Sequence, residues 1–159
     1  MNDYRKLLSV LILLFVLLMF PSSKSYGQAR GIHPGLRVGT YSDVGDIFLG
    51  GGFTTPLGDR WFFNPNFEYV FAEHQTYATF NGDFEYSIPD RVRHVSFWAG
   101  GGLGIVYDNP EGPSGSDTHL GLNLMGGVGI QTGSVMPYIQ PKIILKENSE
   151  FVMGFGVRF

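Results

Sequence analysis

Only one pair of neighbouring side chains in this sequence has the types and spacing for nucleophilic catalysis. His94 and Ser96 stand two residues apart in the segment RHVSFW, so they share one face if the segment is a strand. A histidine beside a serine can act as a general base and activate the hydroxyl for acyl transfer. No HExxH, GxSxG or GxxxxGK[ST] motif accompanies the pair. We therefore take His94 and Ser96 as weak catalytic candidates and expect a protein that is not an enzyme.

A second set of residues points to electrostatic chemistry. Each stands at a polar position of a segment in which apolar and polar residues alternate. A charge enclosed in a narrow protein interior is costly unless it is paired. Three of these residues are basic and three are acidic, which allows complete pairing. The sequence thus predicts a charge network on one face of the strands: Arg37, Glu68, Asp83, Glu85, Lys142 and Arg158.

Composition limits the class of protein that must position these groups. The chain has 159 residues, enough for one domain, and no cysteine, so disulfides and thiolate metal sites are excluded. Glycine occurs 23 times and aromatic residues make up 15% of the chain, whereas charged residues make up only 16%. The net charge of −3 and the absence of a basic cluster exclude a nucleic-acid binder. With no phosphate-binding motif either, we expect no metal site and no cofactor.

The N-terminus has the pattern of an export signal. Arg5 and Lys6 precede the uncharged run 7–20, and a small, polar stretch follows Pro21. We predict a cleaved signal peptide over 1–27, a lead-in over 28–33 and one domain over 34–159. A membrane anchor is the alternative, but fourteen apolar residues are short of the roughly 20 that a spanning helix needs.

The rest of the chain alternates with a period of two, which indicates strands and not helices. All connections are short except 108–117, and short connections favour antiparallel neighbours joined as hairpins. Closure into an up-and-down barrel would remove exposed sheet edges. Pro65, Pro137 and Pro141 fall inside expected strands, where they would mark bulges or misjudged boundaries. The eight expected strands are roughly 34–41, 46–55, 60–71, 76–88, 93–107, 118–131, 135–146 and 150–159.

The two faces of these strands differ in kind. One is bulky and apolar, and the other is small, polar or charged. A soluble, lipocalin-like ligand binder would turn the bulky face inward, whereas a transmembrane barrel turns it outward to lipid. The export signal and the scarcity of charge favour the transmembrane barrel. Aromatic residues near strand ends fit the interfacial girdles of such barrels: Trp61, Tyr69, Tyr77, Tyr86, Tyr107 and Tyr138.

The last ten residues, EFVMGFGVRF, carry a resemblance to a known family. Their alternating apolar set is Phe151, Met153, Phe155, Val157 and Phe159. With the signal peptide and the eight segments, this ending resembles the small eight-stranded outer-membrane β-barrels of the OmpA transmembrane-domain and OmpX type over 28–159. The resemblance implies an all-β, antiparallel, up-and-down transmembrane barrel in the outer membrane, closed by pairing of the last strand with the first. It also implies that the ending is the signal read by the barrel-assembly machinery.

The same resemblance bears on function. It implies a structural or surface-interaction role, with outer-membrane lipid and lipopolysaccharide as partners and a largely filled polar lumen. A narrow channel or carrier for small solutes is the alternative, because inward glycines leave some space, although Trp98 and Tyr138 also point inward and would fill much of it. A soluble periplasmic ligand binder and a lipid A-modifying enzyme are further alternatives. The outer-membrane lipid A deacylase family also has a His-x-Ser pair, but there an Asn follows and the pair faces lipid; here Phe97 follows and we expect the pair to face inward.

The alternating direction of successive strands determines at which end of the barrel the acidic residues lie. If both termini are periplasmic, the connections 42–45, 72–75, 108–117 and 147–149 face outward, and Lys146 is the only basic residue near them. Such residues are ordinary for polar loops. The sharper hypothesis is that they bind divalent cations shared with lipopolysaccharide phosphates. The predicted outer acidic rim comprises Asp43, Asp46, Glu73, Asp108, Glu111, Asp117, Glu147 and Glu150.

Overall fold

The computed structural model describes residues 31–42, 45–72, 75–89, 94–110 and 115–159. The predicted signal peptide 1–27 and residues 28–30 of the predicted lead-in lie outside these residues. Within the described part of the chain, no helix is long and apolar enough to cross a membrane.

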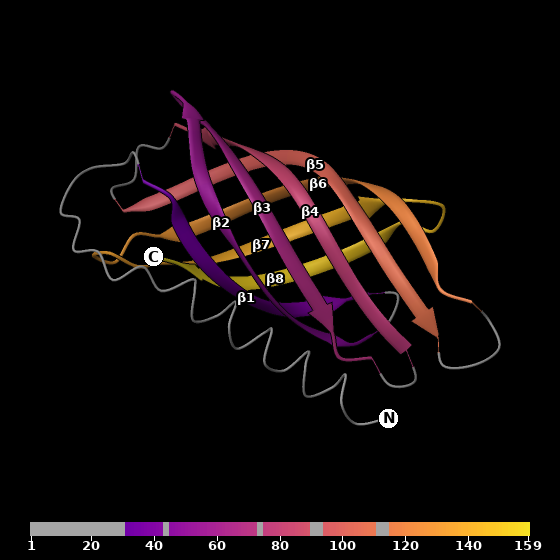
Figure 1. The fold of residues 1–159 in the computed structure, drawn as a ribbon. Coiled ribbons are helices and arrows are strands. Elements are labelled where there is room, and N and C mark those ends of the chain that lie inside the picture. The colour runs from indigo at the N-terminus through magenta and orange to yellow at the C-terminus, as the bar shows by residue number, and fades with distance from the viewer. Residues whose placement is uncertain (1–30, 43–44, 73–74, 90–93, 111–114) are drawn as a thin grey trace.

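Eight strands form one closed antiparallel barrel in sequence order (Figure 1). The last strand pairs with the first, with Val38 opposite Phe155 and Tyr41 opposite Val152, so no sheet edge remains. The all-β, up-and-down barrel predicted from the alternation is confirmed. The strands are β1 His33–Tyr41, β2 Ile47–Gly58, β3 Trp61–Val70, β4 Gln75–Ile88, β5 Val95–Pro110, β6 Asp117–Ile130, β7 Met136–Leu145 and β8 Glu150–Arg158.

The barrel has two unlike ends. The start of β1 and the end of β8 lie at one, which we call the terminal end, together with the turns 59–60 and 131–135 and the end of β4. The end of β1, the start of β4, the end of β5 and the turn 146–149 lie at the other, which we call the loop end. Strands β4, β5 and β6 have 14, 16 and 14 residues and extend beyond their neighbours at the loop end (Figure 1).

The bulky face of the strands is outward. Leu103, Leu122 and Phe155 are about half exposed, whereas Glu68, Asp83 and Asn123 are fully buried inside. A monomeric soluble protein seldom exposes a continuous apolar surface of this kind. The soluble, lipocalin-like arrangement, which requires the bulky face inside, is therefore wrong for this chain. An apolar outer belt around a polar interior is the arrangement of a transmembrane barrel.

Aromatic pairs stiffen the outer face between β3 and β4. Trp61 is paired with Tyr86, and Phe67 with Phe80, with ring centroids 5.1 and 4.7 Å apart. Such cross-strand pairs add packing energy beyond the burial of area. The predicted girdle is correct in orientation for Trp61 and Tyr86, which are exposed. It is wrong for Tyr77, which is buried inside the barrel, and Tyr138 is inside as its strand parity predicted.

The prolines do not disturb the register. Pro65, Pro137 and Pro141 lie opposite Gly82, Val157 and Met153 within regular ladders, so the expected bulges or boundaries at these positions are wrong. The register shift that the structure does contain lies between Pro56 and Gly58, beside the tight turn from β2 to β3. Gly58 has φ +150° there, a backbone conformation that favours glycine.

Candidate functional site: the filled barrel interior

The interior is organised around Glu68 on β3. Lys142 donates to both carboxylate oxygens at 3.1 and 3.0 Å, and Arg37 Nε lies 3.2 Å from Oε1. The hydroxyl groups of Tyr41 and Thr79 also donate to Oε2. Glu68 is fully buried, so its charge is compensated by two cations and two hydroxyl groups and not by solvent. These five residues, which we call the Glu68 cluster, come from β1, β3, β4 and β7.

Next to the Glu68 cluster, towards the terminal end, amide side chains surround Asp83. Asn66 and Asn123 donate to the two carboxylate oxygens of Asp83 at 2.9 and 2.8 Å. Asn81 donates to Asn66 at 3.0 Å and accepts from Asn123 at 2.9 Å, which links three strands in one ladder. Asp83 therefore belongs to the predicted charge network by position, but its hydrogen-bond partners are amides and not a basic side chain.

The remaining charge pair lies nearest the terminal end. Arg158 Nη2 donates to Glu85 Oε1 at 2.8 Å, and Asn64 donates to the same oxygen at 2.7 Å. The guanidinium group stacks on the rings of Trp98 and Tyr138, with its carbon 4.6 and 4.9 Å from their centroids. Such stacking favours arginine over lysine, because the guanidinium is planar and weakly hydrated. All six residues of the predicted charge network thus point into the barrel.

An apolar layer closes the interior on the loop-end side of the Glu68 cluster. Its members are no more than 3% exposed, and seven of the eight strands contribute one residue. The strand without a member is β6, which has Gly121 at this level. Ile144 of β7 fills the space there, since a Cβ at Gly121 would lie 2.5 Å from its Cγ2. Tyr41 joins this layer to the Glu68 cluster, since its ring packs edge-on against Phe48 while its hydroxyl bonds Glu68. The apolar layer consists of Tyr41, Phe48, Val70, Tyr77, Val106, Ile144 and Val152.

The inward glycines do not leave the space that the sequence suggested. At several of them an aromatic side chain from the opposite position on the neighbouring strand lies over the glycine, as Tyr138 does over Gly156 and Phe48 over Gly39. Towards the terminal end a cavity of about 10 Å³ lies beside Arg37, with room for about one water molecule. An eight-stranded barrel is just wide enough for its side chains to fill, and this one is filled.

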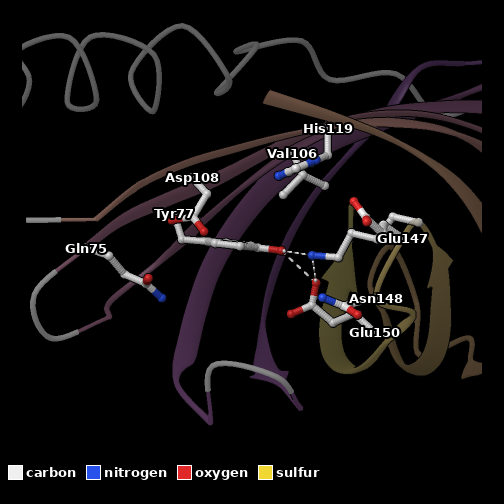
Figure 2. A pocket seen from close by; sticks show the side chains of 9 residues that line it. Gln75, Tyr77, Val106, Asp108, His119, Glu147, Asn148 and Glu150 are labelled. Atoms are coloured by element: carbon white, nitrogen blue, oxygen red, sulfur yellow. Dashed lines mark hydrogen bonds and ion pairs between the residues drawn. The ribbon is translucent and has the colours of Figure 1, made fainter. Parts of the chain in front are cut away.

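At the loop end, beyond the apolar layer, the interior widens into a cavity of about 270 Å³, which we call the vestibule. Tyr77 donates to Glu150 Oε2 at 2.6 Å, and the ammonium group of Lys146 lies 3.1 Å from both that oxygen and the Tyr77 hydroxyl (Figure 2). The lining residues are Gln75, Tyr77, Val106, Asp108, His119, Lys146, Glu147, Asn148 and Glu150.

The predicted acidic rim is only partly exposed at this end. Asp117 and Glu147 are exposed, and Asp46 and Asp108 are half-buried. Glu150 is wrong as a rim residue, because β8 turns it into the barrel, where it is 1% exposed and paired with Lys146. The described residues contain no group of three or more side chains placed to hold a metal ion. Asp43, Glu73 and Glu111 lie outside the described residues, so the divalent-cation hypothesis stays a prediction.

The catalytic candidates are not assembled into a pair. His94 is exposed in the turn before β5 and has φ +70°, which is uncommon for a residue other than glycine. Ser96 is the second residue of β5 and lies opposite Gly129. No hydrogen bond joins the two side chains within the described part of the chain.

The C-terminal apolar set occupies the outer face of the closing strand. Phe151, Phe155 and Phe159 are 43–48% exposed, and Met153 and Val157 are half-buried on the same face. The main-chain N–H of Phe159 donates to Pro34 at 2.9 Å, which extends the β1–β8 pairing past the end of β8. The predicted contact between the last strand and the first is therefore present.

The parity of each strand places Thr79 and the asparagines on the same polar face as the charges, but the sequence did not indicate that they are hydrogen-bond partners of those charges. Tyr41 was missed altogether, although it shares a face with Arg37. Which residue meets which depends on register between strands, and Lys142 and Glu68 are 74 residues apart.

Solved structures with the same arrangement are outer-membrane barrels. The N-terminal β-barrel domain of Pseudomonas aeruginosa OprF is 16% identical with a TM-score of 0.70, over 80% of this chain and 95% of that one. Neisserial surface protein A is 12% identical with a TM-score of 0.61, over 80% and 92%. The outer membrane enzyme PagL is 10% identical with a TM-score of 0.56, over 81% and 99%.

No protein-family model matches the chain, and no curated protein matches it significantly. At these identities the likeness concerns the fold. The chain has the closed eight-stranded fold of the small outer-membrane β-barrels, and its apolar outer surface is consistent with an outer-membrane location.

Proposed function

We propose that the protein is a structural barrel of the outer membrane whose interior is a packed core and not a conduit. Its outer belt contacts membrane lipid and lipopolysaccharide, and its loop end faces the outside of the cell. The role that fits such a molecule is mechanical or adhesive: it holds a rigid, membrane-anchored surface at the cell exterior.

The packing of the barrel interior is the main support for this proposal. The apolar layer crosses the whole interior, and each of its members is at most 3% exposed. Beside it lies the fully buried Glu68 with its two cations. An ion would have to pass a packed apolar constriction and then the Glu68 carboxylate, whose charge is already balanced by Arg37 and Lys142. Both features oppose conduction. A narrow channel or carrier would need a continuous wet path, which neither feature favours.

The test of membrane placement uses cell fractions and gel mobility. The protein is expected in the outer-membrane fraction, with different SDS gel mobilities before and after boiling, because a closed barrel stays folded in cold detergent. A control sample refolded in detergent micelles should give the same two bands. Recovery in the soluble periplasmic fraction with one mobility would overturn the proposal.

We propose no enzymatic role. PagL is an outer-membrane enzyme with a similar fold, but an exposed His94 in a strained turn is poorly placed to activate Ser96. Mass spectrometry of lipid A incubated with the refolded barrel should detect no change. Acyl-chain loss that disappears with Ser96→Ala would instead reveal a hydrolase.

We further propose that β8 is the segment read by the barrel-assembly machinery. The support is twofold: the aromatic residues of β8 form one exposed outer stripe, and β8 makes the closing contact with β1. Until β8 pairs with β1, the edge of β8 is available for contact with the assembly machinery.

A further inference from the structure

Two carboxylate oxygens of residues that line the vestibule have no hydrogen-bond partner among the described residues. Glu150 is 1% exposed, yet its Oε1 has no hydrogen-bond partner within the described residues. Asp108 Oδ1, on the neighbouring part of the cavity wall, is also buried without a partner there. A buried carboxylate oxygen without a donor costs free energy. Both atoms belong to residues that line the same cavity of about 270 Å³ (Figure 2).

The charge of the lining favours a cation. Three carboxylates, from Asp108, Glu147 and Glu150, line the vestibule against one ammonium group, from Lys146. Figure 2 shows Asp108 and Glu150 on different sides of the cavity, with the Tyr77 ring between them. A positively charged guest with N–H donors would therefore meet acceptors and excess negative charge.

The chain itself shows how an ammonium group is held here. Lys146 Nζ lies 3.1 Å from Glu150 Oε2, 3.1 Å from the Tyr77 hydroxyl and 5.4 Å from the Tyr77 ring centroid. Carboxylate, hydroxyl and aromatic face are the groups that bind ammonium ions in proteins. Only one of the two Glu150 oxygens is occupied by this contact.

A metal ion fits the vestibule less well. The described residues contain no group of three or more side chains placed to coordinate one. The cavity is far larger than a bare ion, and the floor is apolar, since Val106 of the apolar layer lines it. An apolar floor suits the hydrocarbon part of an organic guest.

We propose that the vestibule binds a small aliphatic amine through its ammonium group. The ammonium group donates to Glu150 Oε1, the alkyl chain lies on Val106 and the Tyr77 ring, and the carboxylate of Asp108 adds negative charge on the other side of that ring. This site is separated from the Glu68 cluster by the apolar layer, so binding does not require an open lumen.

The experiment is an NMR titration of the refolded full chain in detergent micelles with n-butylamine at low ionic strength. Saturable shifts are expected at Gln75, His119 and the 146–150 segment, and none at the turn 59–60 at the terminal end. 1-Butanol, which lacks the charge, and tetramethylammonium, which lacks N–H donors, should give no saturable shift at the same sites.

Variants make the assignment specific. Glu150→Gln should weaken butylamine binding by roughly 10-fold or more, because it removes the charge-assisted acceptor, and Asp108→Asn should weaken it by roughly 3-fold or more, because it removes a negative charge from the lining. Asp117→Asn is the matched control: Asp117 lies directly opposite Asp108 on β6 and carries the same charge, but it does not line the vestibule. It should leave the affinity within about 2-fold, a change small on the scale of one such hydrogen bond. Heat-dependent gel mobility checks that each variant folds.

Three results would overturn the proposal. One is the absence of saturable shifts. Another is equal weakening by Asp117→Asn and Asp108→Asn, which would reduce the effect to general surface charge. The third is saturation of the same signals by Mg²⁺ at lower concentration than butylamine, which would make the vestibule a metal site.

Discussion

The indole ring of Trp98 lies over Gly127, the residue opposite it on β6, so closely that a Cβ at position 127 would come within 2.2 Å of the ring. Tyr138 and Gly156 stand in the same relation between β7 and β8, and so do Phe48 and Gly39 between β1 and β2. Glycine in these strands is therefore the condition for packing an aromatic ring into a narrow barrel. An aromatic side chain that covers a glycine on the neighbouring strand is also a known way to stabilise a curved sheet.

Gly127→Ala is expected to destabilise the barrel by about 1–3 kcal/mol, because overpacking forces the Trp98 ring or the backbone to move. Urea unfolding in detergent, followed by tryptophan fluorescence, measures the loss. Gly126→Ala is the matched control, since its nearest neighbour, the Trp98 carbonyl oxygen, lies at an ordinary 3.7 Å. Equal effects of the two substitutions would mean that the ring contact does not decide stability.

Glu68→Gln is expected to cost about 3–5 kcal/mol, because it leaves Lys142 and Arg37 buried without their counter-charge. The unfolding midpoint of the refolded protein should fall accordingly. Glu147→Gln, at an exposed position of the loop end, removes the same charge and should change little. Unchanged stability together with new ion conductance in Glu68→Gln would point to a polar path in place of a stabilising network.

Arg158→Lys is expected to destabilise the terminal end by about 1 kcal/mol although it keeps the charge, because lysine cannot stack on Trp98 and Tyr138 as a planar guanidinium does. Thermal unfolding in detergent gives the difference. Glu85→Gln, which removes the charge partner of Arg158, should cost more. An Arg158→Lys variant as stable as the wild-type protein would contradict the importance of stacking.

Phe159→Ser is expected to lower the fraction of heat-modifiable barrel in cells several-fold, while refolding of the purified variant in detergent stays close to normal. This combination separates recognition during assembly from stability. Phe71→Ser is the control, since Phe71 is similarly exposed on the outer face but lies at the loop end outside β8. A parallel loss in both variants would mean that Phe159 acts only as a lipid contact.

The period-two alternation predicted the eight strands, their order and their facing, because a closed barrel enforces inward and outward positions along every strand. The misplacement of Tyr77 and Glu150 follows from neglecting that parity. Tyr77 shares its face with Thr79 and Asn81, and Glu150 shares its face with Val152 and Arg158, all of which point inward. Residues near strand ends were assigned to the girdle or the rim by their chemical type, whereas the alternation along the strand determines whether each one points inward or outward.

What the sequence could not predict depends on contacts across the barrel. No local pattern pairs Lys142 with Glu68, or Ile144 with Gly121, because the register between distant strands sets these contacts. The same holds for the apolar layer, whose members are single residues from seven strands. Along the sequence the inward glycines suggested free space, but in the barrel side chains from neighbouring strands fill it, as Trp98 does beside Gly127.

The most direct test of the filled interior is a planar-bilayer recording of the refolded wild-type protein in concentrated salt, with a water-filled porin as positive control. The apolar layer predicts a membrane current at the baseline level, with no discrete steps, in a preparation that gel mobility shows to be folded. Reproducible unitary steps from the wild-type barrel would contradict the packed interior and make the protein a channel.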